Sequence, residues 1–180
     1  MNAAKDEVKV VNTEKDNIIL IGMPGCGKST VGVVLAKKLG YGFVDSDLVI
    51  QERYGKTLEE LIDEHGDAGF IELENSVNSS LRPHKTVIAT GGSVVYGDKA
   101  MEHLGSIGTI VYLEVPEKEL EERLGSLKER GVVSNGKNTI NEIFEDRKRL
   151  YEKYADITFK QNGEILRQTV EGLYSLIKER

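Results

Sequence analysis

The chain has 180 residues, a length that favours one domain over two. Hydrophobic side chains make up 39% of it, a globular composition that excludes intrinsic disorder of the whole chain. The 24 basic and 30 acidic residues give a net charge of −6, which argues against a surface that neutralises nucleic-acid phosphates. We therefore expect one globular domain with no nucleic-acid partner.

The sequence also limits the compartment of the protein. The single cysteine, Cys26, excludes an internal disulfide, and no apolar run approaches the roughly 20 residues that span a bilayer. Residues 1–16 are polar and lack the apolar segment of a signal peptide. We expect them to form a flexible arm before a single domain over residues 17–180, in a cytoplasmic, monomeric protein that contacts no membrane.

Five apolar segments rich in β-branched residues predict strands, in chain order, at Ile18–Ile21, Gly42–Val44, Thr86–Ala89, Thr109–Val115 and Ile157–Phe159. Each is followed by a segment with helical periodicity or by a glycine-rich turn. This alternation predicts an α/β fold of three layers, in which helices cover both faces of a five-stranded parallel sheet.

A phosphate-binding motif follows the first strand directly. Residues Gly22–Ser29 read GMPGCGKS and fit G-x-x-x-x-G-K-[ST] at every fixed position. The glycines let backbone N–H groups converge on phosphate oxygens, Lys28 adds positive charge, and the Ser29 hydroxyl can ligate Mg²⁺. The motif predicts ATP and Mg²⁺ as cofactors, with the nucleotide held by Gly25, Cys26, Gly27, Lys28, Ser29 and Thr30. For Cys26 no catalytic base is evident, so we interpret it as a small residue that fills the loop.

Two predicted helices carry a charged residue within an apolar stripe. Arg147 shares one helical face with Ile143, Phe144 and Tyr151, a spacing that places its guanidinium towards the interior or a cleft. Glu74 shares a face with apolar residues in the same way, and a buried carboxylate needs a partner. The alternative is that both side chains reach past their apolar neighbours to water.

Four segments together resemble the shikimate kinase family. They are GMPGCGKST at Gly22–Thr30, VDSD at Val44–Asp47, VIATGGSVV at Val87–Val95, and Arg147 with Leu150 and Tyr151. The resemblance extends from about Asn17 to the C-terminus. It implies a P-loop NTPase fold with a small lid at about residues 128–138, and transfer of the γ-phosphate of ATP to a hydroxyl of shikimate, a step of aromatic amino acid biosynthesis.

The resemblance also implies roles on the nucleotide side. Asp45 would complete the Mg²⁺ site with Ser29, and Asp47 would bind and orient the attacked hydroxyl. Both aspartates follow the second strand, at the sheet edge where α/β folds bind ligands. Arg123 matches an arginine beside the adenine, and Arg130 matches a lid arginine that stabilises the transferred phosphate. The candidate catalytic residues are therefore Lys28, Asp47 and Arg130.

On the acceptor side, the resemblance implies that Arg147 grips the substrate carboxylate, a task that suits its planar guanidinium. Gly91 and Gly92 would allow backbone to approach the acceptor, with Ser93 beside them. Asp47 is the fifth residue expected to bind the acceptor, with Gly91, Gly92, Ser93 and Arg147. Glu74 matches an acidic position of the family and would fix an arginine.

The sequence departs from the family at three positions. Ile71 stands where an arginine completes the carboxylate clamp, Ser93 replaces a third glycine, and Gly131 replaces a proline after Arg130. Arg53 and Arg82 are near enough in sequence to be considered as replacement cations. Three functions stay open: a shikimate kinase, a related kinase for another hydroxylated metabolite, and a nucleotide-binding regulatory protein without turnover.

Overall fold

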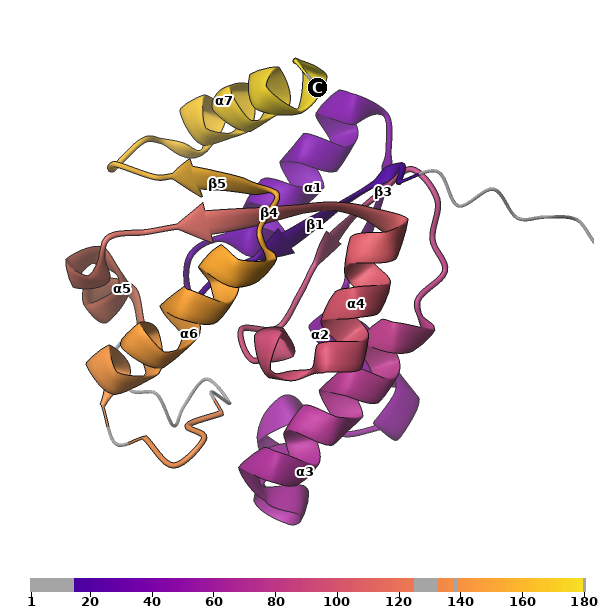
Figure 1. Cartoon of the computed structure of the whole chain (residues 1–180), viewed down its shortest axis with the longest axis vertical. Coiled ribbons are helices and arrows are strands. Elements are labelled where there is room, and N and C mark those ends of the chain that lie inside the picture. Colours follow the sequence, from indigo (N-terminus) through magenta and orange to yellow (C-terminus); the bar gives the residue numbers. More distant parts are fainter. Residues whose placement is uncertain (1–14, 125–132, 138, 180) are drawn as a thin grey trace, which may run out of the picture.

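A five-stranded sheet lies at the centre of the computed structural model, which describes residues 15–124, 133–137 and 139–179 (Figure 1). Its strands are β1 (Asn17–Ile21), β2 (Gly42–Asp45), β3 (Thr86–Ala89), β4 (Gly108–Glu114) and β5 (Ile157–Lys160). The strand order is β2-β3-β1-β4-β5, and every neighbouring pair is parallel. The five predicted strands and the parallel sheet are confirmed.

Helices cover both faces of this sheet. They are α1 (Lys28–Leu39), α2 (Ser46–Tyr54), α3 (Leu58–Ser80), the short 3₁₀ helix η1 (Val94–Tyr96), α4 (Asp98–Ile107), α5 (Glu117–Leu124), α6 (Ile140–Tyr154) and α7 (Leu166–Lys178). Helices α1 and α7 pack together on one face, whereas α4 and α6 contact β4 from the other (Figure 1). Helix α3 packs along α2 and α4. The three-layer arrangement is therefore the predicted one.

The centre of the sheet is apolar for a simple reason. All residues of β1 and β3 are buried, as expected for strands that helices cover on both sides. The continuous apolar segments at β1 and β3 are thus strands buried on both faces, whereas the edge strands β2 and β5 are only partly buried. None of the helices in the described ranges is long and apolar enough to cross a membrane.

The sheet topology brings three chain segments to one edge. Because the strands are parallel, their carboxyl ends meet there, and the loop after β1, Asp45 at the end of β2 and Gly91 after β3 become neighbours. A break at Gly66, with φ 68°, divides α3 into two helical segments. Residues 1–14 of the expected arm and residues 128–132 and 138 of the expected lid lie outside the described residues.

Candidate active site

The loop between β1 and α1 has the backbone that its glycines permit. Gly22, Gly25 and Gly27 all have positive φ, at 145°, 79° and 96°. A Cβ at Gly22 would also come within 2.8 Å of the Leu113 carbonyl oxygen. Lys28 Nζ donates hydrogen bonds to the carbonyl oxygens of Gly22 at 2.7 Å and Met23 at 3.0 Å. The lysine ammonium thus lies over the loop, where a phosphate would be cradled.

Ser29 and Asp45 form the second part of the site. Ser29 Oγ donates to Asp45 Oδ2 at 2.6 Å, and the backbone N–H of Asp47 donates to Asp45 Oδ1 at 3.0 Å, capping α2. The structure therefore joins the two residues that the sequence assigns to a metal. No group of three or more His, Cys, Asp or Glu residues in the described ranges could hold a metal. A cation here would need further oxygen ligands from phosphate and water.

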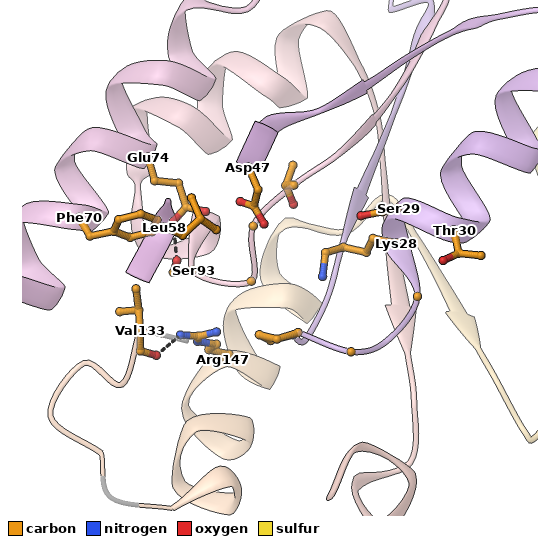
Figure 2. A pocket seen from close by; sticks show the side chains of 16 residues that line it. Lys28, Ser29, Thr30, Asp47, Leu58, Phe70, Glu74, Ser93, Val133 and Arg147 are labelled. Carbon is orange, nitrogen blue, oxygen red and sulfur yellow. Dashed lines mark hydrogen bonds between the residues drawn. The ribbon is translucent and has the colours of Figure 1, made fainter. Parts of the chain in front are cut away.

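A cavity of about 380 Å³ extends from this loop to α6 (Figure 2). It is lined by Pro24, Gly25, Gly27, Lys28, Ser29, Thr30, Asp47, Leu58, Phe70, Glu74, Thr90, Gly91, Gly92, Ser93, Val133 and Arg147. Most of the proposed nucleotide residues and every proposed acceptor residue thus share one cavity. Its described lining carries positive charge only at Lys28 and Arg147.

Asp47 projects from the start of α2 into this cavity (Figure 2). The pKa of its carboxyl is raised to about 6, because burial and the negative charge of Asp45 raise it more than Lys28 lowers it. The carboxyl is therefore mainly ionised at neutral pH. It can accept a hydrogen bond from an acceptor hydroxyl, and its pKa is close enough to neutrality to take that proton.

Glu74 on α3 is buried in the cavity wall. Its Oε2 accepts a hydrogen bond from Ser93 Oγ at 2.6 Å. The pKa of Glu74 is raised to about 8, because burial and the Asp47 charge raise it more than Ser93, Arg147 and Lys28 lower it. The apolar stripe predicted an inward carboxyl, and the resemblance implied an arginine as its partner. The hydrogen bond comes from Ser93, while the positive charge of Arg147 lowers the pKa of Glu74.

We expect Glu74→Gln to flatten the pH dependence of stability. The folded protein binds the Glu74 proton more tightly than the unfolded chain, so this contribution is complete below pH 4.5 and is lost as the pH rises to about 8. Across that range the free energy of unfolding of the unmodified protein should fall by roughly 1.4 kcal/mol per pH unit relative to the variant. Urea unfolding at pH 5.5, 6.5 and 7.5 measures this. Exposed Glu72→Gln is the control, and equal slopes for all three proteins would contradict the expectation.

Arg147 points inward, as its place in the apolar stripe predicted. It is 1% exposed, its Nη2 donates to the Val133 carbonyl oxygen at 2.6 Å, and its guanidinium carbon lies 5.4 Å from the centre of the Tyr96 ring. Its Nε–H has no hydrogen-bond partner in the described structure. A buried cation with an unused donor beside a cavity is suited to binding an anionic group.

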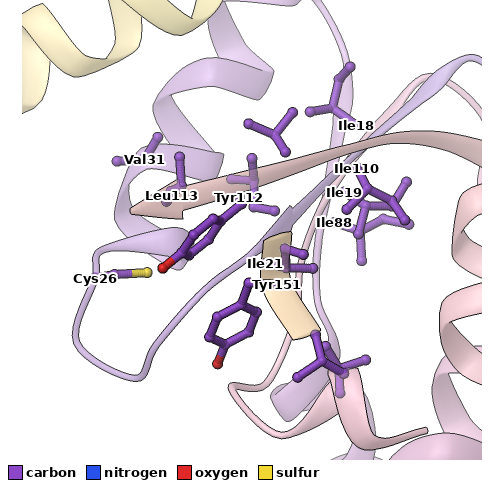
Figure 3. Close-up of a cluster of buried hydrophobic side chains, with 14 of the residues drawn as sticks. Ile18, Ile19, Ile21, Cys26, Val31, Ile88, Ile110, Tyr112, Leu113 and Tyr151 are labelled. Carbon is purple, nitrogen blue, oxygen red and sulfur yellow. The ribbon is translucent and has the colours of Figure 1, made fainter. Parts of the chain in front are cut away.

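The core beneath the cavity fixes this wall. Tyr151, one turn after Arg147, stacks on Tyr112 at 5.0 Å and donates from its hydroxyl to the Gly92 carbonyl oxygen at 2.6 Å (Figure 3). Cys26 is 1% exposed in the same core and does not line the cavity, which fits a loop-filling role (Figure 3). Its backbone belongs to the phosphate loop, and its place among the nucleotide-binding residues stays a prediction.

The apolar part of the cavity wall was not predicted from the sequence. Leu58 and Phe70 of α3 and Val133 line the cavity opposite the phosphate loop. Val133 is 2% exposed, although it lies within the segment, about residues 128–138, that was expected to form the lid. Its burial depends on an unpredicted contact: Asp67 Oδ2 accepts hydrogen bonds from Ser134 N at 3.1 Å, Ser134 Oγ at 2.6 Å and Asn135 N at 2.6 Å.

We expect Asp67→Ala to raise KM for the acceptor about fivefold to tenfold. The change removes three hydrogen bonds, of which each contributes roughly 0.5–1.5 kcal/mol, and so frees the segment that places Val133 over the cavity. Steady-state kinetics at saturating ATP measures this. Asp63→Ala removes an exposed carboxylate from the same helix and serves as the control. A normal KM in the Asp67 variant would show that this contact does not shape the acceptor site.

Other sequence-based expectations fall elsewhere. Arg53 donates to Ser80 Oγ, and Arg82 donates to the carbonyl oxygens of residues 79 and 81; neither lines the cavity, so neither replaces the missing cation. Ile71 is half-buried and packs in a cluster with Phe70 and Val133. Arg130 and the side chain of Arg123 lie outside the described residues.

Comparisons with known proteins agree with this geometry. A family model described as shikimate kinase matches residues 24–178. The chain belongs to the shikimate kinase family. A shikimate kinase of Thermodesulfovibrio yellowstonii is 39% identical over 82% of this chain and 86% of its own length. A shikimate kinase of Persephonella marina is 34% identical over 90% of this chain and 99% of its own length.

Solved structures of shikimate kinases share the fold. The structure of the Acinetobacter baumannii shikimate kinase in complex with shikimate has a TM-score of 0.80 and 29% identity, covering 91% of this chain and 93% of that one. The structure of the Aquifex aeolicus shikimate kinase has a TM-score of 0.74 and 32% identity, covering 90% of this chain and 96% of that one. The family model includes strands β2 to β5 and every described residue that lines the cavity.

Proposed function

We propose that this chain transfers the γ-phosphoryl group of ATP to the 3-hydroxyl of shikimate, giving shikimate 3-phosphate and ADP. The observation that carries the proposal is the single cavity that joins the phosphate loop to Asp47 and Arg147. Membership of the shikimate kinase family and the likeness to a relative solved with shikimate support it. The proposal disfavours a regulatory protein, because Lys28, Ser29, Asp45 and Asp47 are all present and in contact distance of the cavity or of each other.

The acceptor would lie between two side chains of opposite charge. Arg147 offers an unused Nε–H to the carboxylate of shikimate, and Asp47 accepts a hydrogen bond from the hydroxyl that attacks phosphorus. The proton of that hydroxyl passes to Asp47 as the O–P bond forms and the bond to the ADP oxygen breaks. Phosphoryl transfer depends mainly on such positioning and on charge neutralisation, which Lys28 provides at the β- and γ-phosphates.

A divalent cation fits the residues present. Ser29 Oγ and Asp45 Oδ2 are hard oxygen donors 2.6 Å apart at the mouth of the phosphate loop, the ligand type that Mg²⁺ prefers. Ser29 would ligate the ion directly, and Asp45 would hold its water shell. When bound, Mg²⁺ neutralises charge on the transferred phosphate. Arg130 would add a second positive charge from the lid, and Arg123 would lie beside the adenine.

The retained alternative is a kinase for another hydroxylated metabolite. It is favoured by Ile71, because the described cavity offers an anionic acceptor only Arg147 apart from the lysine of the phosphate loop. An ADP-release assay with Mg-ATP on shikimate, beside a panel of polyols, hydroxy acids and sugars at equal concentration, separates the two. Strong turnover of shikimate supports the proposal. Negligible turnover of shikimate with turnover of another acceptor would overturn it.

We expect Ile71→Arg to lower KM for shikimate about tenfold. Phe70 lines the cavity, and position 71 is next to it in the chain. A guanidinium at position 71 is expected to add a charge-assisted contact to the carboxylate, worth roughly 1.5–3 kcal/mol. Ile71→Met is the matched control, since it lengthens the side chain without charge. Kinetics on both variants measure the effect. An unchanged KM in the arginine variant would mean that the pocket differs from the family by more than this residue.

A further inference from the structure

The buried guanidinium of Arg147 has no anionic partner within the described part of the chain. None of the ion pairs found there includes it, its Nη2 donates to the Val133 carbonyl oxygen, and its Nε–H is unpartnered. Burying a charge is costly unless another group of the protein stabilises it. The group that stabilises this cation therefore also affects how it is presented to the cavity (Figure 2).

Tyr96 is the aromatic neighbour of this guanidinium. The guanidinium carbon of Arg147 lies over the Tyr96 ring, 5.4 Å from its centre, which is within the range of a cation–π interaction. Tyr96 belongs to η1, and η1 packs against α6, the helix that carries Arg147. A ring attracts a cation through its π face, so this contact leaves hydrogen-bond donors of the guanidinium available to a ligand.

Asp146 holds the Tyr96 side chain in place. The Tyr96 hydroxyl donates to Asp146 Oδ2 at 2.5 Å. Burial and this hydrogen bond raise the pKa of Tyr96 more than the charge of Arg147 lowers it, so the hydroxyl stays a donor at neutral pH. Because Asp146 precedes Arg147 directly in α6, the same helical turn holds the tyrosine and carries the guanidinium.

We propose that Tyr96 is a positioning residue for the acceptor carboxylate, because its ring supports the Arg147 guanidinium and leaves donors free for that carboxylate. The inference deepens the proposed function and rests on it. Apart from Lys28 in the phosphate loop, Arg147 is the only cation in the described lining of the cavity. The orientation of one guanidinium therefore sets the affinity for the carboxylate. Tyr96 does not line the cavity, so it acts through Arg147.

The test compares shikimate with its methyl ester, which has no carboxylate charge. Tyr96→Leu removes the ring and should raise KM for shikimate about threefold to tenfold, with little change in kcat or in KM for ATP. KM for the ester should change less than about twofold, because the ester makes no charge-assisted contact with the guanidinium. Tyr96→Phe keeps the ring and should stay within about twofold of the normal KM for shikimate.

Tyr154→Leu controls for the packing of α6. The Tyr154 hydroxyl donates to Asp98 Oδ1 at 2.9 Å, so a second tyrosine–aspartate hydrogen bond joins α6 to the start of α4. Neither residue of this pair lines the active-site cavity. We expect Tyr154→Leu to leave KM for shikimate unchanged, even if both leucine variants lower the thermal stability of the protein.

The outcomes separate the two proposals. If the unmodified enzyme does not turn over shikimate, the proposed function fails and this inference falls with it. If it turns over shikimate and Tyr96→Leu leaves KM unchanged, the function stands and the inference is overturned. An equal rise for shikimate and its ester, an equal rise in Tyr154→Leu, or an equal rise in Tyr96→Phe would also overturn it. A rise confined to the charged acceptor and to loss of the Tyr96 ring supports it.

Discussion

Lys28→Met is expected to lower kcat for phosphoryl transfer roughly a thousandfold, while the protein stays folded. Lys28 is 8% exposed, and its ammonium is held over the phosphate loop by the carbonyl oxygens of Gly22 and Met23. A charge fixed in this way stabilises the transition state without reorganisation, and removing one such group costs about 10²–10³ in kcat. Methionine keeps the length of the side chain, so the loss reports on the charge.

The measurement is single-turnover transfer at saturating Mg-ATP, together with thermal unfolding of the nucleotide-free protein. Lys37→Met removes a lysine from the exposed face of the same helix and should leave kcat unchanged. A kcat within threefold of normal for Lys28→Met would show that the loop does not act as the phosphate site. A large loss of thermal stability would instead assign the effect to the two freed carbonyl groups.

Arg147→Lys is expected to raise KM for shikimate about tenfold to hundredfold, with a smaller change in kcat and in KM for ATP. The guanidinium donates to the Val133 carbonyl oxygen and also lines the cavity, and a lysine, with one nitrogen, cannot serve both places. A lost charge-assisted contact accounts for roughly 1.5–3 kcal/mol, which corresponds to this range of KM. Because lysine keeps the positive charge, the variant tests the geometry of the contact.

The control is Arg149→Lys, on the exposed side of the same helix. An acceptor without a carboxylate provides a second comparison, because its KM should respond much less to Arg147→Lys. If KM for shikimate is unchanged, Arg147 serves only to hold Val133 over the cavity. Asp67→Ala, which loosens the same segment without changing the guanidinium, would then reproduce any decrease in kcat that Arg147→Lys causes.

Much of the fold follows from local sequence patterns. Short β-branched segments such as Thr86–Ala89 are strands because a sheet covered on both faces needs continuous apolar strands. The loop at Gly22–Ser29 is equally local, since its glycines take backbone angles that other residues disfavour. Helical periodicity placed Arg147 in an apolar stripe, and the family resemblance favoured the inward direction over the alternative of reaching water.

The acceptor site could be predicted only in part. The sequence placed Asp47, Gly91 and Arg147 near one another through the edge of a parallel sheet and through a family resemblance. It did not supply the partner of Glu74, because Ser93 is 19 residues away and meets it only where α3 crosses the turn after β3. It did not supply the bonds from Asp67 to Ser134, which join segments 67 residues apart.

The sequence by itself therefore determined the strands, the phosphate loop and the place of Arg147 in an apolar stripe, because each depends on neighbouring residues with a fixed period or backbone angle. Only the tertiary structure decided that Cys26 belongs to the core, that Val133 lines the cavity, and that Ser93 donates a hydrogen bond to Glu74. These properties depend on how helices cross and on which side chains they bring within hydrogen-bond distance, and no local pattern encodes that distance.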